Sequence, residues 1–142
     1  MGEKLRLGKG APFTKIPHGA PGIETRVPLL FSEGVMKGKI TLNKFVELVS
    51  TNPAKLAGMY PKKGTIGIGC DADIMIVDRE NEYTISVDML KGAADFTPFE
   101  GYKVKGWPET VISRGNIVVD NGKMIAEPGA GRLIRRNKFK VF

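Results

Sequence analysis

The chain has 142 residues, of which 42% are hydrophobic and 26% charged, a balance typical of one globular domain or of part of a larger one. One cysteine and one histidine exclude an internal disulfide framework and the usual His/Cys ligand set of a metal site within the chain. The net charge of +7 leaves nucleic acid or an acidic surface open as partners, whereas no apolar run is long enough to cross a bilayer and no signal peptide opens the chain, so we expect a cytoplasmic protein with no membrane partner.

Glycine and proline punctuate residues 1–24, which predicts an irregular segment. It leads into IPHGAPGIETR (16–26), the stretch around the only histidine, His18. A lone histidine can act as a general base if an orienting partner and a substrate lie within reach. Its neighbours Pro17 and Gly19 instead favour a turn whose main-chain groups matter more than the imidazole, and this is the interpretation that we prefer.

Helices are predicted between residues 25 and 60. Thr25 is expected to cap the first, with Pro28 in its first turn and Gly34 at its end. The second is expected to begin at Thr41, because an apolar stripe at i, i+3, i+4 and i+7 follows. That stripe is Leu42, Phe45, Val46 and Val49.

The stretch STNPAKLAGMY (50–60) predicts a third, short helix. Asn52 before Pro53 combines a cap residue with a proline at the first helical position, which is a helix-start signal. Gly58 is expected to end that helix.

Residues 64–127 are predicted to form short strands. The Asn121-Gly122 pair between two apolar runs is the signature of a tight hairpin. The expected strands are TIGIG (65–69), DIMIVD (73–78), YKVK (102–105), TVISRG (110–115), NIVVD (116–120) and KMIAE (123–127).

No group of residues forms a self-sufficient catalytic site. Asp71 and Asp73 could pair as metal-binding or proton-sharing carboxylates, but a turn before a strand is the favoured interpretation. GTIGIG (64–69) opens no helix and is therefore no dinucleotide-binding fingerprint. Ser32, Ser113 and Cys70 lack a histidine in a nucleophile context, and we expect Cys70 to be a small packed residue.

Four stretches together resemble the C-terminal part of the hydantoinases and dihydropyrimidinases, cyclic amidohydrolases of the metal-dependent amidohydrolase superfamily, with allantoinases as near relatives. The resemblance covers roughly residues 4–136. The stretches are GAPGIETRVPLLFSEGV (19–35), STNPAKLAGMYPKKGTIGIGCDADIMIVD (50–78), DFTPFEGYKVKGWPETVISRG (95–115) and EPGAGRLIRR (127–136).

The resemblance implies an α/β fold, a (β/α)₈ barrel with a β-sandwich built from both chain ends. Residues 1–60 would be the loop after the last barrel strand and the terminal helices, residues 61–127 the C-terminal sandwich strands, and residues 128–142 a basic arm. The family's two zinc or other divalent ions are held by a His-x-His pair, a carboxylated lysine, two further histidines and an aspartate. None of these ligands maps onto this chain, so no cofactor is expected within it.

The resemblance also implies a substrate contact. Where this chain has His18, the family usually has an asparagine whose backbone touches the cyclic amide, so the His18 backbone and the adjacent Gly19 are the candidate substrate-binding residues. No catalytic residue and no metal ligand is expected in the chain.

We therefore expect the C-terminal segment of an enzyme that hydrolyses the ring amide of hydantoins or dihydropyrimidines, inactive as an isolated chain. The alternative is a non-catalytic binding or assembly module derived from that family. Strands without their N-terminal partners would expose edges, so we expect a homo-oligomer or domain swap, or incomplete order near the N-terminus. The basic residues of the arm are interpreted as solvated or oligomer-contacting, with nucleic acid the less favoured partner. They are Arg132, Arg135, Arg136, Lys138 and Lys140.

Overall fold

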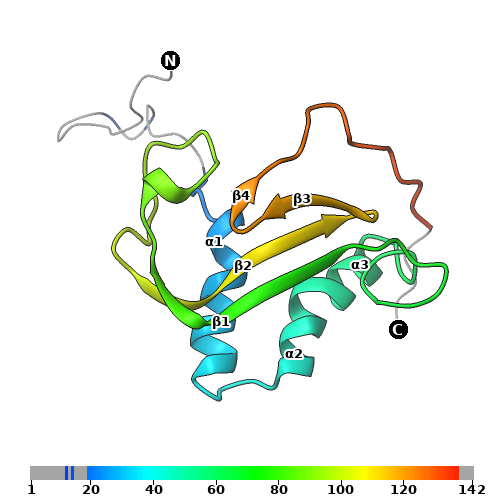
Figure 1. Ribbon diagram of the computed structural model, residues 1–142, viewed down its shortest axis with the longest axis horizontal. Coiled ribbons are helices and arrows are strands. Elements are labelled where there is room, and N and C mark those ends of the chain that lie inside the picture. Colours follow the sequence, from blue (N-terminus) through cyan, green and yellow to red (C-terminus); the bar gives the residue numbers. More distant parts are fainter. Residues whose placement is uncertain (1–11, 13, 15–18, 138–142) are drawn as a thin grey trace.

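The computed structural model describes Pro12, Thr14 and residues 19–137, and in that part of the chain helices come first and strands follow. Figure 1 shows the helices lying against one face of a twisted antiparallel sheet. The elements are α1 (Ile23–Leu30), a π-helical stretch (Phe31–Met36), α2 (Leu42–Val46), a second π-helical stretch (Glu47–Thr51), α3 (Asn52–Leu56), β1 (Ile74–Thr84), a 3₁₀ turn (Val87–Met89), β2 (Lys103–Ser113), β3 (Asn116–Asp120) and β4 (Lys123–Met124).

The four strands lie in sequence order and pair antiparallel, β1 with β2, β2 with β3, and β3 with β4. The predicted hairpin at Asn121-Gly122 is confirmed, with φ of 48° and 72° at the two turn residues. The Gly122 N–H also donates a hydrogen bond of 2.9 Å to the Glu109 carbonyl of β2. A second tight turn, Arg114-Gly115, has φ of 50° and 82° and joins β2 to β3.

The first helix differs from its prediction at both ends. It begins after Gly22, whose carbonyl accepts the first helical hydrogen bond from the Arg26 N–H at 3.0 Å, so Thr25 lies inside the helix and is buried rather than a cap. Gly34 does not end the helical run, which continues to Met36. Its missing side chain makes room for Ile40, whose Cδ1 would lie 2.9 Å from an added Cβ, and Gly38 at φ 67° ends the run instead.

The second helical run has the predicted start but no break in its middle. The Thr41 hydroxyl caps it by accepting a hydrogen bond from the Lys44 N–H at 3.2 Å, as expected. The predicted helix at Asn52 is present as α3, with Pro53 in its first turn. Asn52 is not a cap, because Thr51 and Asn52 both keep helical φ and ψ and α3 continues directly from the preceding π-helical stretch. A wider π-turn, in which the Asn52 N–H donates to the Glu47 carbonyl, leads into Pro53, which has no N–H to offer. Gly58 at φ 68° ends the run as predicted.

The predicted strand at residues 65–69 is absent. Gly64 and Gly69 have φ of 84° and 85°, which turns the chain on either side of the run, and no strand is assigned there. Ile66 and Ile68 are largely exposed. β-Branched propensity at these positions is therefore overridden by the glycine turns.

The core lies where the end of α1 and the following π-helical stretch cross β2. Phe31 packs edge to face on Phe45 with ring centroids 5.3 Å apart, and both are buried. Phe31 also lies on the backbone of Gly106, which has φ of 94° in β2. The Ser32 hydroxyl accepts a hydrogen bond from the Lys105 N–H at 3.1 Å, which ties the helical run to the same point of the strand.

A bulge interrupts the β1–β2 ladder between Asp78 and Glu82. The Asp78 carboxylate organises it by accepting hydrogen bonds from the Asn81 amide at 2.7 Å and the Tyr83 hydroxyl at 2.8 Å. These bonds lower the pKa of Asp78 to about 2.

The C-terminal segment returns to the helices. The Asn137 N–H donates to the Gly58 carbonyl at 2.8 Å, and the Arg114 guanidinium donates to the Ala130 carbonyl. Of the basic arm, residues 128–137 are described and are mostly exposed, while Lys138 and Lys140 lie outside the described residues. In the part of the chain that the structure describes, no helix combines the length and the apolar character that crossing a membrane requires.

Candidate functional site

The described part of the candidate substrate loop begins at Gly19. His18, the residue whose backbone was expected to face a substrate, lies outside the described residues. Gly19 is exposed, has φ of 93°, and an added Cβ would meet no atom within 4 Å. The structure therefore places Gly19 in a conformation that favours glycine, and its expected contact with a substrate stays a prediction.

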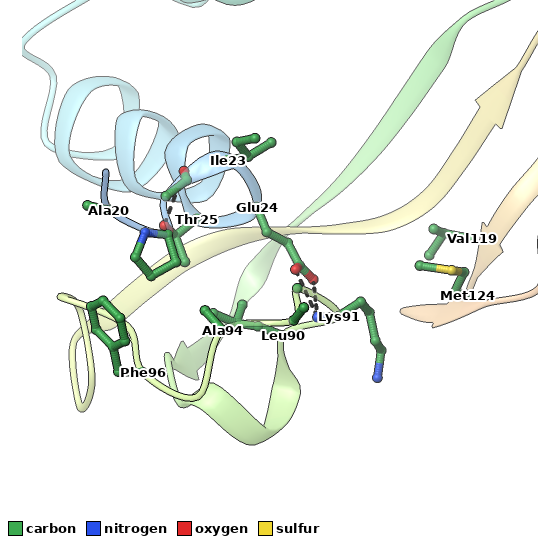
Figure 2. A pocket seen from close by; sticks show the side chains of 14 residues that line it. Ala20, Ile23, Glu24, Thr25, Leu90, Lys91, Ala94, Phe96, Val119 and Met124 are labelled. Atoms are coloured by element: carbon green, nitrogen blue, oxygen red, sulfur yellow. Dashed lines mark hydrogen bonds between the residues drawn. The ribbon is translucent and has the colours of Figure 1, made fainter. Parts of the chain in front are cut away.

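Residues 20–25 form one wall of an open, largely apolar cavity of about 610 Å³. Segment 90–96 forms a second wall, and Val119 and Met124 of the β3–β4 hairpin lie across the opening (Figure 2). The start of α1 thus brings the predicted loop against two segments that are distant in sequence. Such a surface can hold the apolar part of a ligand or of another polypeptide segment.

Hydrogen bonds to one side chain connect the wall at residues 20–25 to the wall at segment 90–96. Both Glu24 carboxylate oxygens accept the Lys91 N–H, at 3.1 and 2.9 Å, across 67 residues of sequence (Figure 2). The carboxylate also lies in the first turn of α1, where the helix dipole favours a negative charge. Glu24 therefore fixes the position of segment 90–96 against the helix.

Replacing Glu24 by alanine is expected to loosen this wall. The Lys91 N–H loses its acceptor, so the chain should be destabilised by about 1 kcal/mol, and hydrogen exchange at Lys91 should accelerate. Urea denaturation and amide exchange measure the two effects. Glu24→Gln keeps an acceptor oxygen and is the control; equal exchange at Lys91 in the alanine and glutamine variants would contradict this role.

A second cavity, of about 650 Å³, lies beside the same loop. It shares residues 20–22 with the first and is otherwise lined by α1, the adjoining π-helical stretch and the segment before β2. Its charged groups are Arg26 and Glu33. A hydrogen bond from Lys37 at 2.7 Å holds the pKa of Glu33 below its usual value. The loop that ends at Gly22 therefore separates two hollows of the surface.

The two carboxylates of the sequence motif GCDAD are brought together, but by a lysine. Lys63 Nζ lies 2.9 Å from Asp71 Oδ2 and also contacts Asp73 Oδ2. Partial burial lowers the pKa of Lys63, but the hydrogen bonds to Asp73 and Asp71 outweigh it and hold that pKa above its usual value. Both aspartates lie in the irregular stretch directly before β1, and Lys63 joins them in an ion-pair cluster.

This lysine cluster also fixes the turn between β2 and β3. Asp73 Oδ1 accepts the Arg114 N–H at 2.8 Å, and the Gly115 N–H donates to the Ala72 carbonyl at 3.0 Å. Burial raises the pKa of Asp73, yet the hydrogen bonds from Lys63 and Arg114 bring it below its usual value. The Lys63–Asp71–Asp73 cluster therefore stabilises the fold, and Asp71 and Asp73 do not form a proton-sharing pair of carboxylates.

The described residues do not fit the metal centre that the resemblance implies. Among Pro12, Thr14 and residues 19–137, no three His, Cys, Asp or Glu side chains gather in a way that could hold a metal ion. Asp71 and Asp73 face a cation of the protein itself. Ser32 accepts a backbone hydrogen bond, and Cys70 is half-buried. What the site offers is an apolar wall and positioned main-chain groups.

Sequence reasoning found the loop but missed what lies opposite it. Segment 90–96 carries no periodic pattern, and only its end, DFTPFEG (95–101), was singled out by the resemblance. Glu24 in GIETR was a partial signal, because an acidic side chain in the first turn of a helix is favoured by the helix dipole and can also accept an N–H from a neighbouring segment. Its partner Lys91 could not be identified without the tertiary fold.

Known proteins share both the sequence and the fold of this chain. The Amidohydrolase family profile matches residues 16–118. A D-hydantoinase from Geobacillus stearothermophilus is 52% identical over 138 residues, which make up 97% of this chain and 29% of the relative. A D-hydantoinase from Ralstonia pickettii is 48% identical over 90% of this chain and 28% of the relative.

The fold comparison gives the same picture. The crystal structure of a dihydropyrimidinase from Brevibacillus agri NCHU1002 matches with a TM-score of 0.87 at 51% identity, covering 91% of this chain and 28% of that one. The chain thus spans less than a third of the length of the relatives that it matches.

Proposed function

Because the chain belongs to the amidohydrolase family, we propose that it is the C-terminal segment of a cyclic amidohydrolase that opens the ring amide of hydantoins or dihydropyrimidines. The observation that carries the proposal is the match of 52% identity along 97% of the chain to a D-hydantoinase. The divalent metal ions of that chemistry, two zinc or similar ions by the resemblance, would be held outside this chain. The residues that the structure describes would shape the surroundings of the substrate.

The proposed division of labour follows the order of the elements. Residues 1–60 would be the loop and terminal helices of the barrel, residues 61–127 the C-terminal strands of the sandwich, and residues 128–142 a basic arm. Supporting this, the last described α-helix ends at Leu56 and the four strands all follow. Within this frame the main chain at His18 and Gly19 would face the cyclic amide, and the residues that follow Gly19 line the first cavity.

The enzyme is proposed to be cytoplasmic and homo-oligomeric. Apolar side chains that stay exposed support further association, since Ile23 is 88% exposed and Leu133 95%. The same exposure would also serve the alternative, a non-catalytic assembly module. A measurement of activity separates the two functions.

The isolated chain is expected to show no turnover of hydantoin or dihydrouracil, with or without added Zn²⁺ or Mn²⁺. In contrast, a full-length chimera, the G. stearothermophilus D-hydantoinase with its aligned segment replaced by this chain, should open the hydantoin ring. Ring opening is followed by loss of absorbance of the cyclic substrate. Turnover by the isolated chain would contradict the assignment as a segment, and a folded but inactive chimera would favour the assembly module.

A further inference from the structure

Residues 86–100 form a compact surface loop whose two ends meet, and segment 90–96 is part of it. The Ile85 N–H donates to the Tyr102 carbonyl at 2.8 Å, and the Gly101 N–H donates to the Ile85 carbonyl at 2.8 Å. Ile85 itself is fully buried, so the base of the loop is anchored in the core. A loop closed in this way is an Ω-loop, a kind of loop that frequently carries functional contacts.

Two glutamates hold this loop by its main chain. Close to the base, the Glu100 carboxylate accepts a hydrogen bond from the Val87 N–H at 2.9 Å. Further along the loop, the Glu24 carboxylate accepts the Lys91 N–H, with the shorter of its two contacts at 2.9 Å (Figure 2). Glu100 belongs to the loop itself, whereas Glu24 belongs to α1. Glu24 therefore joins the part of the chain that contains the strands to the start of the first helix.

The first turn of α1 is joined to Gly19 by a short link. Residues 20–22 lie between Gly19 and the helix, and the ring of Pro21 fixes one φ of that link. The Gly22 carbonyl is held by the first helical hydrogen bond, from the Arg26 N–H at 3.0 Å. A displacement of the first turn of α1 would therefore move the main chain at Gly19 with it.

The main chain from Gly19 to Pro21 is available to a ligand. In the part of the chain that the structure describes, its N–H and carbonyl groups make no hydrogen bond to another residue. Main-chain groups of this kind fix the orientation of a bound molecule when they are held in one position. What holds the link in position therefore matters for binding.

We propose that Glu24 is a positioning residue for the cyclic amide. By holding loop 86–100 against the first turn of α1, Glu24 keeps the main chain at Gly19 in the position from which it reaches the substrate. The inference rests on the proposed function, because it takes Gly19 as a substrate contact. It adds that a loop between β1 and β2, remote in sequence from Gly19, sets the affinity of the site.

Loss of the bond between Glu24 and Lys91 should weaken substrate binding without slowing the chemical step. In the proposed enzyme the metal ions and their ligands lie outside this chain, so the reacting atoms do not depend on Glu24. An interaction that holds the substrate and the transition state equally well raises KM when it is lost and leaves kcat unchanged. We expect roughly a five-fold rise in KM, the change in affinity that the loss of one ordinary hydrogen bond produces.

Steady-state kinetics of ring opening in the full-length chimera test the proposal. Glu24→Ala should raise KM for hydantoin roughly five-fold and change kcat by less than about two-fold. Glu24→Gln keeps an acceptor oxygen for the Lys91 N–H and should return KM to within about two-fold of the wild-type value. Lys63→Met is the matched control, because it breaks an ion-pair cluster that involves neither α1 nor loop 86–100, and it should leave KM unchanged.

A double-mutant cycle tests whether Glu24 acts through the Lys91 N–H. Lys91→Pro removes that N–H, and Leu90 before it has φ of −81° and ψ of 148°, an extended conformation that suits a following proline. Lys91→Pro should raise KM as Glu24→Ala does, and Glu24→Ala should add nothing further in the Lys91→Pro background. Additive effects would place the role of Glu24 elsewhere and would overturn the proposal.

The inference and the proposed function fail in different ways. If the wild-type chimera does not open the ring, the proposed function fails, and the inference that rests on it fails as well. If the chimera opens the ring but Glu24→Ala leaves KM unchanged or lowers kcat alone, the inference is wrong and the proposed function stands. An equal rise of KM in Lys63→Met would reduce Glu24 to a general contribution to stability and would also overturn the inference.

Discussion

Replacing Gly106 by alanine is expected to destabilise the chain by about 2–5 kcal/mol, a large share of the 5–15 kcal/mol that holds a typical domain folded. The added Cβ would lie 2.1 Å from Cδ1 and 2.6 Å from Cε1 of Phe31. Phe31 cannot yield easily, because its ring is buried against Phe45. The φ of 94° at Gly106 adds backbone strain for any residue with a side chain. Urea denaturation of the isolated chain measures the loss as a lower midpoint at unchanged slope.

Two control variants distinguish the steric clash between the new methyl group and Phe31 from the backbone strain at positive φ. Gly101 has φ of 77°, and an added Cβ there meets nothing within 4 Å, so Gly101→Ala should cost only the backbone term of about 1 kcal/mol. Phe31→Leu gives the new methyl group room, so the double variant with Gly106→Ala should be less destabilised than the sum of the two single variants. Strict additivity, or an equal loss at Gly101, would contradict the packing explanation.

Replacing Lys63 by methionine is expected to cost about 2 kcal/mol, less than the 3–5 kcal/mol typical of a fully buried pair, because solvent reaches this cluster. The side chain of Lys63 is 15% exposed and those of Asp71 and Asp73 are 20% and 37% exposed. Methionine keeps the apolar stem but leaves two carboxylates facing each other. Urea denaturation at neutral pH measures the loss.

The matched control is Lys44→Met. It breaks an ion pair with Glu47 whose members are about half exposed, and it should cost less than about 0.5 kcal/mol. Adding Asp73→Asn to Lys63→Met removes the repulsion and should recover part of the stability. Equal losses at Lys63 and Lys44 would mean that the cluster contributes no more than a surface pair.

The contribution of the Lys63–Asp71–Asp73 cluster also depends on pH. The pKa of Asp73 is lower in the folded chain than its ordinary 3.8, so its stabilisation is present above about pH 4 and is lost as the pH falls through the folded pKa. The pKa of Lys63 is higher than its ordinary 10.5, so its stabilisation is present below about pH 10 and is lost as the pH rises through the folded pKa. The difference in stability between wild type and Lys63→Met should therefore shrink as the pH falls below the folded pKa of Asp73 and as it rises above the folded pKa of Lys63.

Features that depend on neighbouring residues were predictable from the sequence. The Thr41 cap, the helix end at Gly58 and the Asn121-Gly122 turn depend on the conformations that a few adjacent residues favour, and the structure has each of them. At Asn52-Pro53 the predicted helix is present as α3, but Asn52 does not cap it. Helical φ and ψ continue there from the preceding π-helical stretch, which local signals did not indicate.

Features that depend on distant contacts could not be predicted in this way. Gly106 resembles any glycine in a strand until Phe31, 75 positions earlier, is placed on it. The sequence around Lys63 does not indicate that this lysine forms an ion pair, although its two partners, Asp71 and Asp73, stand out in the sequence. In the candidate site, the loop at residues 19–22 was identified from the resemblance, but the wall at segment 90–96 emerges only from packing.

The turn between β3 and β4 also affects how the protein ages. An Asn-Gly pair loses ammonia when the glycine nitrogen attacks the asparagine side chain and closes a succinimide ring. In this turn the Gly122 N–H is bound to the Glu109 carbonyl at 2.9 Å, and the Asn121 amide donates to Asp120 at 3.1 Å. Both reacting groups are held in other interactions, so the cross-strand bond that fixes the register of the sheet also slows deamidation at the residue pair most prone to it.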